Sequence, residues 1–116
     1  RAGLPVTWIW QRYLANTKDL IVRIRWTVPA AAALDRIQDY IAKENPRAAF
    51  EVVQRIRVAV SQLEQHPKVG RPGRVRRTSE LVIHDMPYIV AYRIKSSEAQ
   101  ILSVYHTSRK WPDAFD

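Results

Sequence analysis

The sequence predicts a small α+β domain, in which a mostly antiparallel four-stranded sheet carries an N-terminal helical hairpin on one face. Three observations predict this fold. A strand-like segment precedes two amphipathic helical segments, and three further strand-like segments follow them with hairpin-length connections. The expected element order is β-α-α-β-β-β, and it leaves the opposite face of the sheet open. A length of 116 residues suits one such domain.

The first strand is expected over residues 20–27, where apolar residues alternate with arginines. A period of two gives this strand one apolar face and one basic face. The apolar positions are Val22, Ile24 and Trp26, and the basic positions are Arg23 and Arg25.

Two helices are expected next, joined tightly to form a hairpin. Pro29 fits the first turn of the first helix, where its missing N–H costs nothing. Asn45 is expected to cap the second helix and Pro46 to begin it. Apolar residues recur at helical spacing along both segments, and the second helix should end before Pro67.

Three short strands are expected over residues 80–84, 88–94 and 99–106, after a basic loop at 66–77. Alternation along 88–94 turns the bulkier side chains toward the helices and leaves Arg93 on the open face. There Arg93 is suited to bind phosphate, and the alternative is an ordinary surface salt bridge to Glu80 or Glu98. In the last strand, alternation places Leu102, Val104 and His106 on one face and Ile101, Ser103 and Tyr105 on the other.

The composition is that of a globular protein, with 47% hydrophobic and 26% charged residues. Cysteine is absent, which removes disulfides and cysteine-based metal sites. No apolar run approaches the roughly 18 residues that a membrane span needs, and residues 4–10 do not make a secretory h-region. We expect a cytoplasmic protein with one domain over residues 20–116 and an N-terminal extension over 1–19, to which no function is assigned.

The formal net charge is +8, and the cations are unevenly distributed. Such an excess favours a polyanion or an acidic protein partner. No acidic residue lies between Glu64 and Glu80, and a solvated basic loop is the alternative interpretation of this segment. The candidate nucleic-acid-binding or partner-binding residues are Lys68, Arg71, Arg74, Arg76, Arg77 and Lys110.

Residues that can handle phosphate cluster where the last strand ends. His106 offers a base, Tyr105 a phenol and Arg109 a cation. We expect Arg93 and the arginines of the basic loop to converge with His106 and Arg109 on one basic concavity. The alternative interpretation is an ordinary strand whose last residues are polar because they are exposed to solvent. Three scattered histidines without a carboxylate cluster make a poor metal site, and no phosphate-binding glycine loop is present, so we expect no metal and no cofactor.

The order of elements and several short stretches together resemble the RelE/ParE superfamily of toxins from type II toxin–antitoxin modules. The resemblance covers residues 21–111, and it rests on the joint order of the stretches. They are Trp26-Thr27 with residues 31–34, residues 39–41, 45–49, 66–74, 80–82 and 88–93, and the run from His106 through Trp111 to Pro112.

This resemblance implies a toxin that an acidic, partly disordered antitoxin neutralises. The RelE branch cleaves mRNA on the ribosome, whereas the ParE branch poisons DNA gyrase and is not a nuclease. Ile89 departs from the RelE pattern, which commonly has arginine there. His106, Arg109 and Tyr105 still offer a base, a cation and an acid. We therefore expect an endoribonuclease that inhibits translation. The alternative is ParE-like inhibition of gyrase, and the third interpretation is an inactive or diverged toxin.

Overall fold

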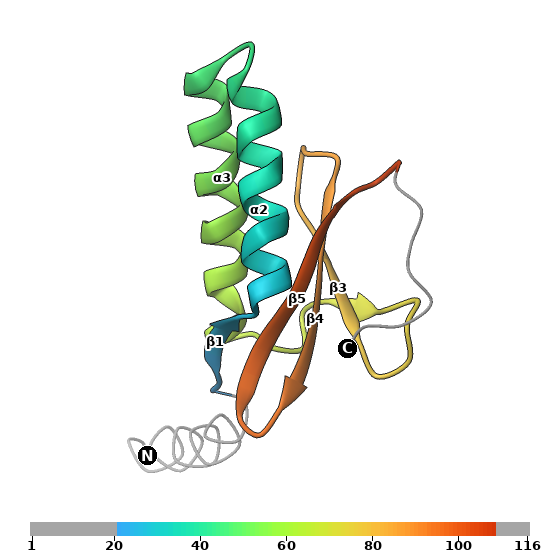
Figure 1. Cartoon of the computed structure of the whole chain (residues 1–116). Helices are drawn as coiled ribbons and strands as arrows, with labels where there is room; N and C mark the ends of the chain where they lie inside the picture. Colours follow the sequence, from blue (N-terminus) through green and yellow to red (C-terminus); the bar gives the residue numbers. More distant parts are fainter. Residues whose placement is uncertain (1–20, 109–116) are drawn as a thin grey trace, which may run out of the picture.

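The computed structural model describes residues 21–108, and it contains two helices packed against one sheet (Figure 1). Strand β1 (Arg23–Trp26) leads into helices α2 (Val28–Ala42) and α3 (Pro46–Ser61), and a short 3-10 turn, η1 (Gln62–Glu64), follows. The remaining elements are strands, in the order β2 (Arg71–Pro72), β3 (Ser79–Val82), β4 (Tyr88–Lys95) and β5 (Glu98–His106). The predicted α+β fold is confirmed. No helix within this part of the chain is both long enough and apolar enough to span a membrane.

The sheet has five strands in the order β1-β5-β4-β3-β2, one more than predicted. β1 runs parallel to β5, and every other pair is antiparallel, as a mostly antiparallel sheet requires. The additional strand, β2, lies inside the segment predicted to be a basic loop. It pairs only Arg71 and Pro72 with β3, because proline lacks the N–H that a longer ladder would use.

Both helices cover one face of the sheet (Figure 1). Asn45 caps α3 as predicted, accepting a hydrogen bond from the N–H of Ala48 at 3.0 Å. Thr27 caps α2 in the same way, and its hydroxyl also donates to the carbonyl of Ile101 at 2.6 Å. One side chain therefore ties the start of α2 to the middle of β5. Beneath the helices, the largest fully buried apolar side chains are Tyr92, Leu34, Ile56, Leu63, Ile101, Val60 and Val90.

A register shift between Ala91 and Tyr92 changes which face the side chains of β5 occupy. Ala91 pairs with Ser103, but Tyr92 pairs with Ile101, so one residue of β5 has no direct partner. As a result, Ile101 and Val104 both lie in the core under the helices. The predicted alternation, which placed these two residues on opposite faces, is wrong because it assumed an unbroken period of two.

Candidate functional site

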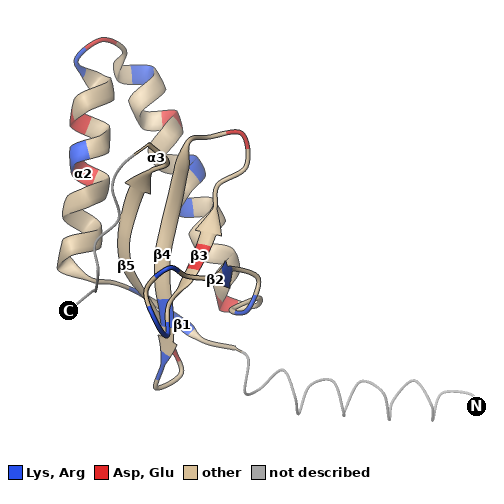
Figure 2. Ribbon diagram, turned by 90° about the vertical axis from the view of Figure 1, so that its right-hand side faces the viewer, with Lys and Arg blue, Asp and Glu red and all other residues tan. Residues whose placement is uncertain are grey.

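Cations collect on the sheet face that the helices leave uncovered, toward the end where β4 turns into β5 (Figure 2). Register places Arg25, Gln100 and Arg93 in one row across β1, β5 and β4, and the next row pairs Arg23 with Glu98 and Lys95. Cross-strand partners share a face of the sheet. Arg93 therefore lies on the open face, as predicted.

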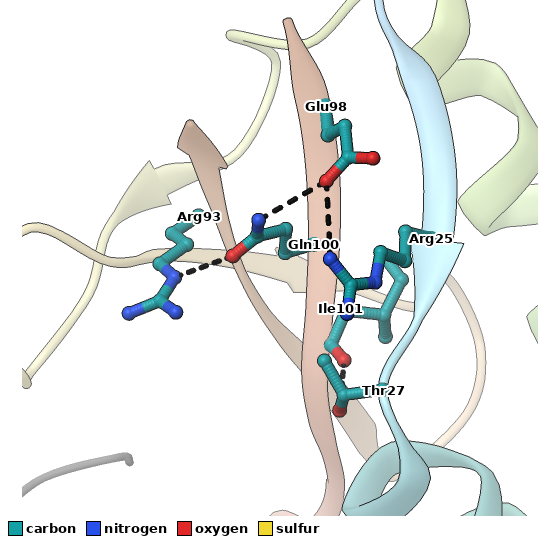
Figure 3. Close-up of polar contacts among 6 residues, drawn as sticks. All are labelled: Arg25, Thr27, Arg93, Glu98, Gln100 and Ile101. Atoms are coloured by element: carbon teal, nitrogen blue, oxygen red, sulfur yellow. Dashed lines mark hydrogen bonds and ion pairs between the residues drawn. The ribbon is translucent and has the colours of Figure 1, made fainter. Parts of the chain in front are cut away.

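A chain of polar contacts orders this row (Figure 3). Arg93 donates from Nε to Oε1 of Gln100 at 2.7 Å, and Gln100 donates from Nε2 to Oε1 of Glu98 at 3.1 Å. Glu98 also forms an ion pair with Arg25, with 3.5 Å between Nη1 and Oε1. The two terminal nitrogens of Arg93 point away from Gln100 (Figure 3). The partner of Arg93 is thus an amide, rather than Glu80 or Glu98.

The hydrogen bond from Gln100 is the main reason why the pKa of Glu98 is lowered, and the charge of Arg25 adds to the effect. Gln100 itself is buried. A buried amide that accepts from Arg93 and donates to Glu98 has a fixed orientation, because reversing it would lose both bonds. The relay therefore holds the Arg93 fork in place for an anion.

The basic segment predicted to bind a partner forms the β2–β3 hairpin and the loop before it. Lys68, Arg71, Arg74, Arg76 and Arg77 are all exposed. Arg71 forms an ion pair with Glu80 at 3.0 Å, and Glu80 is only 2% exposed. The structure thus brings the candidate binding residues of this segment together on one hairpin, beside the open sheet face (Figure 2).

His106 lies at the far end of β5, on the helix side of the sheet. It pairs with Tyr88, and the two rings meet edge to face with centroids 5.5 Å apart. The backbone N–H of Ser108 donates to Nδ1 of His106 at 3.2 Å. Since an N–H can only donate, Nδ1 is the acceptor, and the neutral ring carries its hydrogen on Nε2.

His106 also borders a pocket of about 580 Å³ between α2 and the ends of β4 and β5. The apolar lining comes from Ala33, Ile37 and Val104, and the polar lining includes Arg36, Tyr40 and Tyr88. Burial is the main reason why the pKa of Tyr88 is raised, with nearby Tyr40 adding to the shift. Within residues 21–108, no three histidine or carboxylate side chains gather as a metal site would require.

The structure does not bring His106 and Arg93 together. Gln100, the partner of Arg93, precedes His106 by six positions in β5, which corresponds to about 20 Å. The two side chains also occupy opposite faces of the sheet. Tyr105 pairs with Ile89, so it shares the open face with Arg93 but lies about 13 Å away along the strand. The expected single concavity is therefore wrong.

Two predicted site residues, Arg109 and Lys110, lie outside the described residues. Conversely, the positioning roles of Gln100 and Glu80 could not be predicted from the sequence. Neither residue belongs to a local motif. Their roles depend on cross-strand register, which becomes readable only when the partner strand of each is known.

Comparison with known proteins gives consistent matches over most of the chain. Residues 24–111 match the family described as "ParE toxin of type II toxin-antitoxin system, parDE". The chain is 51% identical over 90 residues to "Putative toxin Y4kP" of Sinorhizobium fredii, covering 78% of this chain and 93% of that protein. It is 30% identical over 89 residues to "Toxin RelE2" of Caulobacter vibrioides, covering 77% and 99% respectively. A solved chain from "Chromosomal ParDE TA system from P. aeruginosa" has a TM-score of 0.69 at 32% identity, covering 74% of this chain and 96% of that one.

Proposed function

Since the chain belongs to the ParE family of toxins from type II toxin–antitoxin systems, we propose that it arrests growth by binding DNA gyrase and that it is not itself a nuclease. The observation that carries this proposal is the separation of His106 from Arg93. General acid–base catalysis at a phosphate needs a proton-transfer group and a cation within hydrogen-bond reach of one reacting group. Within residues 21–108, the predicted base His106 and the predicted cation Arg93 lie on opposite faces of the sheet, whereas the other predicted cation, Arg109, lies outside the described residues.

The identity of residue 89 supports the same conclusion. Ile89 lies on the open face of β4, where it pairs with Tyr105, and it is buried. An aliphatic side chain at this place supplies neither charge nor a hydrogen bond to a phosphate. The RelE-like position that commonly carries arginine is therefore apolar here, which weakens the case for RNA cleavage.

As a toxin of this class of module, the protein has a cognate antitoxin as a partner. We propose that the antitoxin is acidic and partly disordered, as the net charge of +8 suggests. We propose that gyrase contacts the basic hairpin and the row around Arg93. An acidic segment of the antitoxin that binds there would neutralise these cations.

Ribosome-dependent mRNA cleavage remains a second candidate, because His106 is exposed and its tautomer is fixed. Ser108 holds Nδ1, so the ring presents Nε2–H to solvent beside the pocket that Arg36 also lines. An N–H in this position can donate a hydrogen bond to a phosphate oxygen of a bound message. Under this alternative, the catalytic cation would have to come from Arg36, from Arg109, which lies outside the described residues, or from the target complex, since Arg93 is too far away.

The test is to induce the protein in bacterial cells and to follow plasmid supercoiling, bulk mRNA integrity and protein synthesis together. We expect growth arrest with loss of negative supercoiling, while ribosome-bound messages stay intact. His106→Gln keeps the size of the side chain and should act like wild type. Rapid cleavage of messages by wild type, abolished by His106→Gln, would overturn the gyrase proposal in favour of the second candidate.

A further inference from the structure

The hairpin that carries the arginines is built more rigidly than a solvated basic loop needs to be. Two buried side chains from the sheet hold it, one from β3 and one from β4. Glu80 is 2% exposed and Tyr92 is fully buried. A charged carboxylate is rarely buried unless several partners offset its desolvation.

Glu80, in β3, binds both β2 and the turn that follows it. Its Oε1 lies 3.0 Å from both Nε and Nη2 of Arg71, and its Oε2 accepts a hydrogen bond from the backbone N–H of Arg74 at 3.0 Å. The carboxylate therefore fixes one side chain and one stretch of backbone at once. Removing it would leave the arginine and the backbone N–H without these partners.

Tyr92 fixes the chain just before β2. Its hydroxyl donates to the carbonyl of Pro67 at 2.8 Å and accepts from the N–H of Gly70 at 3.0 Å. Glycine is needed at position 70, because a Cβ there would lie 2.5 Å from the hydroxyl oxygen of Tyr92. The chain before β2 is thus pressed against the sheet.

The turn between β2 and β3 is closed by its own contacts. Gly73 donates from its N–H to the carbonyl of Thr78 at 2.8 Å, and a Cβ at Gly73 would collide with the Thr78 side chain. Arg77 adopts a φ of 66°, a left-handed conformation that an arginine rarely takes. Strain of this kind persists only where the surrounding contacts fix the backbone, and it commonly marks a functional segment.

We propose that residues 67–78 form a rigid cationic ribbon that binds the phosphate backbone of duplex DNA, and that Glu80 is the residue that positions it. Arginine, the main cation here, presents a planar fork that matches a phosphate. The ribbon has no tryptophan, tyrosine or phenylalanine on which an unstacked base could lie, so it fits a backbone rather than single-stranded bases. In its biological role this inference rests on the proposed function, since gyrase acts on duplex DNA.

Binding to labelled DNA without gyrase tests the proposal. The probes are a 20-base-pair duplex, a single-stranded RNA of equal length and poly-glutamate of similar charge, each titrated with the full chain from about 50 to 200 mM salt. We expect the duplex to bind most tightly. Replacing both Arg76 and Arg77 with glutamine should lower the salt slope by about 2, because each lost phosphate contact removes roughly 0.9 from it.

Glu80→Gln distinguishes the role of Glu80 in positioning the ribbon from the effect of its negative charge on DNA binding. It removes a negative charge, so simple attraction predicts tighter binding to DNA. We expect the opposite, a roughly 2- to 10-fold weaker affinity, because flexible side chains must then be ordered on binding. Trypsin should also cut the ribbon faster. The matched control is Glu51→Gln, which removes the same charge from an exposed position of α3 outside the ribbon and should bind DNA at least as tightly as wild type.

Each other outcome overturns a stated part of the proposal. Unchanged or tighter binding by Glu80→Gln would dismiss the positioning role. If poly-glutamate bound as tightly as the duplex or more tightly, the ribbon would be a site for an acidic protein. If the single-stranded RNA bound more tightly than the duplex, the assignment of duplex DNA as the ligand would be wrong. If Glu80→Gln does not fold, the exposed Arg76 and Arg77 substitutions still decide whether the ribbon binds. If wild type inhibits gyrase but binds no duplex DNA, this inference is overturned and the proposed function stands.

Discussion

Single polar side chains decide the geometry of the cationic face, and Gln100 is the most central of them. It accepts from Arg93 and donates to Glu98, and the latter bond is the largest cause of the lowered pKa of Glu98. Gln100→Ala should therefore raise the pKa of Glu98 toward its ordinary value. A carboxyl-carbon NMR titration measures this directly, and Lys95→Gln, a neighbouring change outside the relay, serves as the control. An unchanged titration of Glu98 in Gln100→Ala would contradict the relay.

Tyr92 links the sheet to the ribbon through its hydroxyl. Tyr92→Phe keeps the packing but leaves the Pro67 carbonyl and the Gly70 N–H without this partner, so it should lower the free energy of unfolding by about 1–3 kcal/mol. Urea denaturation at neutral pH measures the loss. A change within error would mean that water replaces both bonds.

The same hydroxyl predicts a pH dependence. Burial raises the pKa of Tyr92 in the folded protein. The folded state therefore holds its proton more tightly, and the stabilisation is fully present below the unfolded pKa of about 10 and is lost as pH rises through the folded value. Tyr92→Phe should show a shallower loss of stability above pH 10. If the free energy of unfolding fell equally steeply above pH 10 in wild type and in Tyr92→Phe, this prediction would be wrong.

At the scale of elements, helix α3 packs an apolar face into the core. Ile56 of α3 is 0% exposed, so Ile56→Ala should cost about 2–5 kcal/mol through lost burial and the cavity that remains. Val58→Ala on the same helix is the matched control. Val58 is 60% exposed, and its substitution should stay within about 0.5 kcal/mol of wild type. Equal costs for the two variants would show that α3 is not packed as described.

The helices could be predicted from the sequence because their signals are local. Asn45-Pro46 carries both a cap and a first-turn proline, and the structure confirms both. The face of β5 could not be predicted, since the register shift opposite Ala91 and Tyr92 has no local signature. This single shift helps to place Ile101 in the core and His106 on the helix side. Alternation along β4 places Arg93 correctly, whereas the shift puts His106 on the opposite face, in addition to its distance along the strand.

At the scale of the molecule, the sequence predicted the superfamily from stretches spread over most of the chain, and the family match over residues 24–111 confirms it. The match begins after the N-terminal extension. We therefore predict that deletion of residues 1–19 leaves growth arrest intact. Induction of the truncated protein, with its soluble yield verified, tests this. A soluble and folded truncation that no longer arrests growth would assign a function to the extension.

One measurement tests both the gyrase assignment and the separation of the two faces. It is how strongly the protein inhibits the supercoiling reaction of purified gyrase. Wild type and His106→Gln should inhibit with the same half-maximal concentration, because the imidazole lies on the helix side, away from the cationic face. Arg93→Gln, which removes one of the charges of that face, should inhibit more weakly. The account would be contradicted if wild type left supercoiling unaffected, or if His106→Gln alone abolished the inhibition while Arg93→Gln kept it.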